Sequence, residues 1–98
     1  MMKQLNKRYH DALIVKWLIE NEDFQIEYKC LSGDTGTLIF HNCSNSDEVI
    51  EELEKGMKYK CKTYRPEIIG FGSRKHNLVE IDCDIGLLEI YCTSISET

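Results

Sequence analysis

Hydrophobic and polar residues alternate most regularly near the end of the chain, from residue 79 to residue 92. Apolar side chains recur at every second position on both sides of a break at residues 84–87, where the alternation changes phase. This change predicts a β-hairpin closed by a two- or four-residue loop. Burial of the apolar face sets the register, because a slip of one residue would expose that face. The predicted cross-strand partners are Cys83 with Leu88, Ile81 with Ile90, and Val79 with Cys92.

The first part of the chain changes from a helical period to an alternating one. An apolar stripe that includes Leu13 and Trp17 has the spacing of an amphipathic helix over residues 4–20. After a polar turn, residues 24–30 alternate as a strand, and residues 37–41 return as its partner beyond a glycine-bearing loop. The pattern therefore predicts a helix followed by a β-hairpin.

The middle of the chain predicts a second helix and two further strands. Residues 47–55 carry a helical apolar stripe, with Ser46 placed to cap its start and Gly56 placed to end it. Residues 57–63 alternate as a strand, and residues 68–71 form a short strand in which glycines indicate a bulge. The strand over 57–63 would present a basic outer stripe of Lys58, Lys60 and Lys62.

Together these elements predict one α+β domain over residues 1–98. A chain of this length buries about two-thirds of its unfolded surface, in a single core. The expected order is α-β-β-α-β-β-β-β. It describes a mostly antiparallel sheet of five or six strands with two helices covering it.

The chain is acidic, with 17 Asp and Glu residues against 12 Lys and Arg and a formal net charge of −5. This balance argues against salt-driven attraction to nucleic-acid phosphates, which needs clustered cations. It favours a basic protein partner, because complementary charge accelerates and selects association. No membrane is expected to be involved, since no stretch approaches the ~20 apolar residues of a membrane span.

The five cysteines predict a reducing compartment. They are odd in number and contain no Cys-x-x-Cys pair, whereas a secreted disulfide scaffold normally uses an even set. Four of them fall at inward positions of the predicted strands, where a free thiol behaves as a small hydrophobic group. We therefore expect a cytoplasmic protein, in the host cytoplasm if the chain is viral. The strong bias to Ile and Lys, with one Ala and one Pro, favours a bacterial or viral source.

Acidic side chains supply the main candidate site. Three of them alternate along one strand face from residue 80 to residue 84, about 6.6 Å apart at two residues of strand rise. With Glu89 they could frame a divalent cation. The same alternation is typical of a solvated sheet face, so we predict no metal site. In the predicted register Asp82 opposes Glu89, a repulsion that the lysine stripe or a basic partner would compensate. The candidate partner-binding residues are Glu51, Glu52, Glu54, Glu80, Asp82, Asp84 and Glu89.

A basic loop over residues 65–76 offers an alternative contact for nucleic acid, in which an aromatic ring stacks on a base between cations. Catalytic signals are weak: His41 and Cys43 stand two residues apart, which does not by itself orient a base toward a nucleophile. No phosphate-binding loop or zinc spacing occurs, so neither a cofactor nor enzymatic activity is predicted. The alternative nucleic-acid contacts are Arg65, Phe71, Arg74 and Lys75.

By size, charge and lack of catalytic motifs, the chain resembles the small acidic proteins that act stoichiometrically on a larger protein. Phage inhibitors of host defence, anti-CRISPR proteins among them, and toxin-immunity proteins belong to that class, although no residue motif links the chain to them. We therefore expect a protein-binding inhibitor of a basic, nucleic-acid-handling partner. The alternatives are a nucleic-acid-associated module that uses loop 65–76, and a small metal-dependent hydrolase or nuclease.

Overall fold

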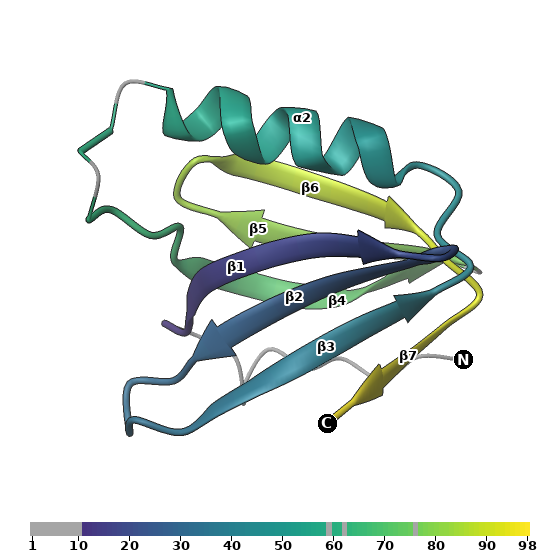
Figure 1. Cartoon of the computed structure of the whole chain (residues 1–98), viewed down its shortest axis with the longest axis horizontal. Helices are drawn as coiled ribbons and strands as arrows, with labels where there is room; N and C mark the ends of the chain where they lie inside the picture. Colours follow the sequence, from purple (N-terminus) through teal and green to yellow (C-terminus); the bar gives the residue numbers. More distant parts are fainter. Residues whose placement is uncertain (1–10, 59, 62, 76) are drawn as a thin grey trace.

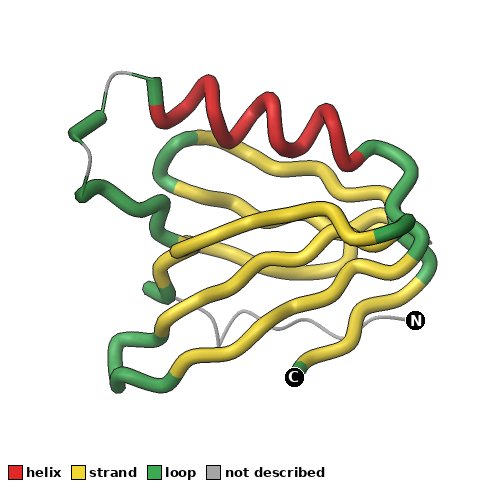
Figure 2. Tube along the Cα trace, in the orientation of Figure 1, coloured by secondary structure: helices red, strands yellow, loops and turns green. Residues whose placement is uncertain are grey.

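A computed structural model describes residues 11–58, 60, 61, 63–75 and 77–98. These residues form two antiparallel sheets and one helix (Figures 1 and 2). The four-stranded sheet has the order β1-β2-β3-β7, and the three-stranded sheet has the order β4-β5-β6. The elements are β1 (Leu13–Glu20), β2 (Asp23–Lys29), β3 (Thr35–His41), α2 (Ser46–Met57), β4 (Ile68–Lys75), β5 (Leu78–Cys83), β6 (Gly86–Tyr91) and β7 (Ser94–Glu97).

The predicted fold class, one sheet of five or six strands with two helices, is wrong. The described residues form a mostly β architecture in which the two sheets enclose a common core. The helix α2 lies along β6, an outer strand of the three-stranded sheet, and contributes Val49 and Leu53 to that core (Figure 1). Each sheet supplies one wall, and the helix closes one side.

The predicted helix over residues 4–20 is wrong where the structure describes it. Residues 13–20 form β1, and residues 4–10 lie outside the described part. This stretch is apolar on both faces, and a register shift between Ile14 and Lys16 breaks its alternation, so its spacing imitates a helix. Its β-branched and aromatic residues fit a strand that packs on β2. Backbone bonds also join its start to β4: Asp11 N–H donates to the Ile68 carbonyl over 2.8 Å.

The predicted strand over residues 57–63 is also wrong. Met57 ends α2, and the described residues that follow, as far as residue 66, form an irregular connection; residues 59 and 62 lie outside the description. The helix continues through Gly56 to Met57, and a Cβ at Gly56 would lie 2.7 Å from Ile85 Cδ1. Gly56 therefore serves close packing rather than ending the helix. Of the two described lysines of the predicted basic stripe, Lys58 follows the last residue of α2 and Lys60 Nζ lies 4.9 Å from the centre of the Tyr64 ring, so these two do not form a strand face.

The β2–β3 hairpin, the helix α2 and the closing β5–β6 hairpin are confirmed, but the register of the last one differs. Cys83 pairs with Gly86, and Ile81 pairs with Leu88. The loop contains two residues, and Gly86 with φ of 134° accommodates the tight turn. A shift of two residues preserves the inward and outward faces. It nevertheless changes the neighbours, because Glu80 now opposes Glu89.

Strand β7 was not predicted. It has one inward apolar residue, Ile95, among polar ones, so its hydrophobic pattern is too weak to indicate a strand. Backbone pairing places it beside β3, where Thr98 N–H and Thr37 N–H each donate to the other residue's carbonyl. The short strand therefore owes its place to hydrogen bonds more than to burial.

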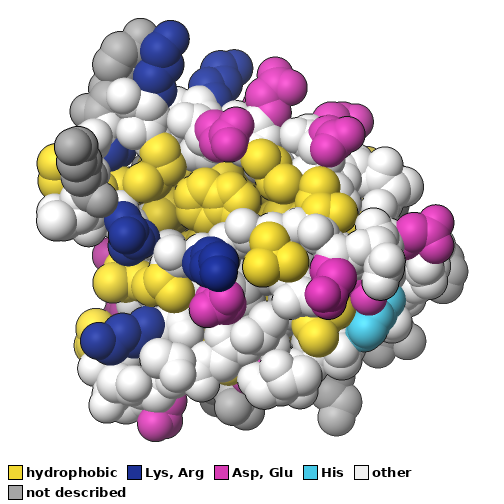
Figure 3. Space-filling view, in the orientation of Figure 1, with side chains coloured by type: hydrophobic (Ala, Val, Ile, Leu, Met, Phe, Trp, Pro, Cys, Tyr) yellow, Lys and Arg dark blue, Asp and Glu magenta, His cyan; other side chains and the backbone are white. Residues whose placement is uncertain are grey.

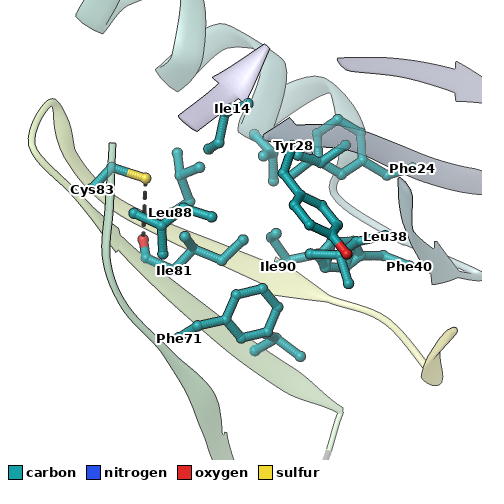
Figure 4. Close-up of a cluster of buried hydrophobic side chains, with 14 of the residues drawn as sticks. Ile14, Phe24, Tyr28, Leu38, Phe40, Phe71, Ile81, Cys83, Leu88 and Ile90 are labelled. Carbon is teal, nitrogen blue, oxygen red and sulfur yellow. Dashed lines mark hydrogen bonds between the residues drawn. The ribbon is translucent and has the colours of Figure 1, made fainter. Parts of the chain in front are cut away.

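The core joins the two sheets through aromatic and aliphatic side chains that point toward one another (Figure 4). The Phe40 ring of β3 lies 5.9 Å from the Phe24 ring and 6.3 Å from the Phe71 ring of β4. Burial raises the pKa of the Cys83 thiol to about 12 and that of Cys92 to about 11. All five cysteines are free thiols.

Within the described residues, α2 does not meet the length and apolarity that a membrane-spanning helix requires.

Candidate functional site: an acidic surface beside a helix

The helix α2 is fixed to β6 by the residue that precedes it. The Asn45 amide donates from Nδ2 to the Glu89 carbonyl over 2.8 Å, and its Oδ1 accepts the Tyr91 N–H over 3.0 Å. One side chain thus satisfies the hydrogen bonds of two backbone groups on an edge strand, as a neighbouring strand would. Asn45 replaces the predicted Ser46 at the start of the helix, and Ser46 is the first helical residue.

A groove runs between α2 and β6. Its helix side is acidic because Glu51 and Glu52 follow Glu48 by three and four residues and share its face. Its strand side presents the outward residues of β6, namely Leu87, Glu89 and Tyr91. Val49 and Leu88 also line the groove.

The acidic character continues from the groove across the outer face of the three-stranded sheet. Glu80 of β5 is the direct partner of Glu89, and Asp82 is the partner of Leu87. On the next strand, the positions opposite these two acids are glycines. We call the whole set the acidic surface. It consists of Glu48, Glu51, Glu52, Glu80, Asp82 and Glu89.

The acidic surface concentrates negative charge. Among the described residues, none of its four groove glutamates forms an ion pair within 4 Å. Figure 3 shows acidic side chains along the visible side of α2. Like charges on neighbouring strands and on one helix face repel each other, so the groove carries a negative potential.

Two apolar side chains complete the groove. Leu87 is 48% exposed and Tyr91 is 41% exposed, and both flank Glu89 on β6. Tyrosine is enriched at the centres of protein interfaces, and polar and charged residues surround such centres. These two residues and Glu48 were not among the predicted contacts. The alternation of β6, whose even-numbered residues face the core, could have identified Leu87 and Tyr91.

The structure brings five of the seven predicted acids together and separates the other two. Glu54 is exposed on α2 but does not line the groove. Asp84 lies in the β5–β6 turn, where its Oδ2 accepts the Tyr64 hydroxyl and its Oδ1 accepts the Glu67 N–H over 3.0 Å. Asp84 therefore holds the connection after α2 in place.

Phe71, the aromatic residue of the alternative nucleic-acid contact, is not available to a ligand. Phe71 is 3% exposed and stacks on Phe40 in the core, so it cannot stack on a base. Arg65 is half-buried and donates from Nη1 to the Tyr64 carbonyl over 2.8 Å. Arg74 and Lys75 lie in β4, and their side chains are outside the description.

His41 and Cys43, the weak catalytic candidates, make contacts with different residues and not with each other. Cys43 Sγ lies 3.5 Å from Asn45 Oδ1, whereas the His41 ring contacts Asp23 and Ser96 on neighbouring strands. In the described part of the chain, no group of three or more metal-ligating side chains is arranged to hold an ion.

No protein-family model, characterised protein or solved structure matches the chain.

Proposed function

We propose that the protein binds a larger basic protein stoichiometrically and acts as its inhibitor or as an adaptor. The acidic surface makes the contact. The observation that carries this proposal is the groove between α2 and β6, where four glutamates gather beside exposed Leu87 and Tyr91. Charge on the rim accelerates association, and the apolar pair supplies the contact that slows dissociation.

A basic partner of this kind handles nucleic acid in many cases, because a groove that binds phosphates is lined by Lys and Arg. A rigid acidic surface can occupy such a groove in place of the phosphates. This mode would suit an inhibitor of the anti-defence or toxin-immunity type, acting in the cytoplasm of a bacterial cell. The five free thiols support the cytoplasmic part of the proposal.

Capture from nuclease-treated lysate of the source cell, at low and high salt, tests the proposal. The test variant carries E51K, E52K and E89K, all within the groove. The control variant carries E20K, E22K and E54K, which change the net charge equally at exposed positions outside the groove. We expect the wild type and the control to retain one basic partner at low salt and the groove variant to lose it.

The outcomes separate the alternatives. Equal loss in both triple variants would show that only net charge matters, and retention in both would overturn the proposal. Recovery of nucleic acid instead of protein, at low salt and without nuclease, would support the nucleic-acid module.

The apolar half of the groove has its own test once a partner is captured. Tyr91→Ala removes an exposed ring and should weaken binding about tenfold or more through faster dissociation. The groove variant should instead lower the association rate, and the effect should shrink as salt increases. Ile69→Ala is the matched control, because Ile69 is 44% exposed on β4 and does not line the groove.

A further inference from the structure

Three polar side chains from three neighbouring strands meet on the outer face of the four-stranded sheet. Asp23 begins β2, His41 ends β3, and Ser96 lies in β7. Ser94 is the direct partner of His41, and Ser96 lies two residues along β7 on the same face. A long side chain reaches such a diagonal neighbour. We call Asp23, His41 and Ser96 the serine–histidine row.

His41 connects the other two members of the row. Its Nδ1 lies 3.4 Å from Asp23 Oδ2, and its Nε2 lies 2.7 Å from Ser96 Oγ. The Asn42 N–H donates to Asp23 Oδ1 over 3.1 Å and so orients the carboxylate. A carboxylate at Nδ1 and a hydroxyl at Nε2 is the arrangement in which histidine acts as a base toward serine.

The row is accessible from solvent. The His41 side chain is 35% exposed and that of Asp23 is 32% exposed, while Ser96 is exposed on an outer strand. A reagent can therefore reach Ser96 Oγ without any opening of the fold. The row shares no residue with the acidic surface, so variants can separate the two.

We propose that Ser96 is a nucleophile for acyl transfer, with His41 as its general base and Asp23 as a positioning residue. Ser96 Oγ attacks the carbonyl carbon of an ester and forms an O–C bond, while His41 Nε2 takes the hydroxyl proton. The bond to the leaving alcohol breaks, and the alcohol takes the proton from Nε2. Water then attacks the acyl-serine, again giving a proton to His41. The carboxylic acid leaves, and the proton held at Nε2 returns to Ser96 Oγ. Asp23 stabilises the tautomer with Nδ1–H and the imidazolium.

The exposure of the row defines its substrate class. On an open sheet face, water provides most of the stabilisation of the tetrahedral oxyanion, which an enclosed site would provide with fixed donors. The leaving group must therefore depart readily, as the phenolate of an aryl ester does. Small activated esters fit this requirement, and amides do not.

A fluorophosphonate probe tests the nucleophile directly, because Oγ displaces fluoride from phosphorus while His41 takes the proton. We expect the intact chain to be labelled once, with the label on Ser96 by peptide mapping. S96A and H41Q should abolish labelling, and aryl-ester hydrolysis should fall with them. Ser94→Ala is the matched control, since Ser94 lies on the same face of β7 and directly opposite His41.

Asp23 needs a readout beyond loss of labelling, because Asn42 also bonds to it. D23N should slow labelling at least tenfold, and D23E should restore part of the rate. Thermal melts of all variants check that the fold is retained. The proposal is overturned if Ser96 in the folded wild type is labelled no faster than Ser94, or if S96A and S94A behave alike. The row would then be a hydrogen-bond network that holds β7 against β3.

Discussion

The outer face of the four-stranded sheet and the acidic surface arrange charge in opposite ways. On the outer face, acidic side chains have partners on neighbouring strands: Lys16 Nζ lies 3.9 Å from Glu27 Oε2, and His41 Nδ1 lies 3.4 Å from Asp23 Oδ2. On the acidic surface, like charges meet, and Glu80 opposes Glu89 directly. Opposite charges across strands stabilise a sheet and like charges destabilise it. Glu27 and Asp23 therefore have partners within the chain, while the four groove glutamates form no ion pair within 4 Å among the described residues.

This difference indicates what each region can do. A face whose polar groups are already paired can hold side chains in fixed positions, as chemistry at Ser96 requires. A surface with unbalanced charge gains free energy only when a partner of opposite charge arrives. The following predictions test this contrast, beginning with the core that supports both regions.

The largest effect on stability is expected in β3, which has core residues on one side and outer-face residues on the other. Phe40 is fully buried between rings of both sheets, so Phe40→Ala should cost about 3–5 kcal/mol of unfolding free energy. Ile39, its neighbour in the chain, points to the outer face, and Ile39→Ala should cost less than about 1 kcal/mol. Denaturant unfolding measures both values. Similar losses would mean that the outer face is also a packed interface.

Alkaline pH should lower the stability of the protein, because a buried thiol lies in the core beneath the acidic surface. Burial, with a smaller contribution from the carboxylates of Asp84 and Asp82, raises the pKa of Cys83 to about 12. The unfolded chain loses the thiol proton near pH 9, so stability falls as pH rises from about 9 toward 12. Cys83 alone should account for about 2 kcal/mol of the loss by pH 10.5, and Cys92, whose pKa burial raises to about 11, adds to the decline. Cys83→Ala should therefore reduce this decline, and a decline unchanged in that variant would contradict the assignment.

The attachment of α2 should depend on Asn45. Asn45→Ala leaves the Glu89 carbonyl and the Tyr91 N–H without these partners, so we expect a loss of about 1–3 kcal/mol. Hydrogen exchange should show faster opening of α2, and the effect should be smaller at the β2–β3 hairpin. A Ser44→Ala variant, at an exposed neighbouring position, serves as the control. Uniformly faster exchange across both sheets would mean that the helix does not open separately.

Much of this fold follows from hydrophobic alternation, and the exceptions have physical causes. The β2–β3 and β5–β6 hairpins were predictable because one face of each is buried and the other is polar. Strand β1 was not, because its bulge and its two apolar faces obscure period two. Lys58, Lys60 and Cys61 are all exposed in the connection after α2, so the alternation there imitated a strand without a buried face.

The site was partly predictable for the same reason. A register shift of two residues does not change which side chains of a strand point inward and which point outward. Glu80, Asp82 and Glu89 were therefore correctly placed on the outward face. Contacts between distant segments were not predictable. The roles of Asp84 and Phe71 depend on Tyr64 and Phe40, which no local pattern connects to them. The serine–histidine row likewise requires β7, whose pairing the hydrophobic pattern did not indicate.

The smallest effect tests the contrast most directly, because it predicts opposite signs for two similar changes. Glu27→Gln removes an attraction to Lys16 and should lower stability by about 0.2–1 kcal/mol. Glu89→Gln removes a charge opposite Glu80 and beside the helix glutamates, so it should raise stability by a few tenths of a kcal/mol. Both changes keep the side-chain shape and alter the net charge equally. Paired thermal melts at low and high salt measure the difference, which should shrink as salt screens both interactions. If Glu89→Gln also destabilises the protein, the acidic surface is balanced within the chain, and its proposed demand for a basic partner disappears.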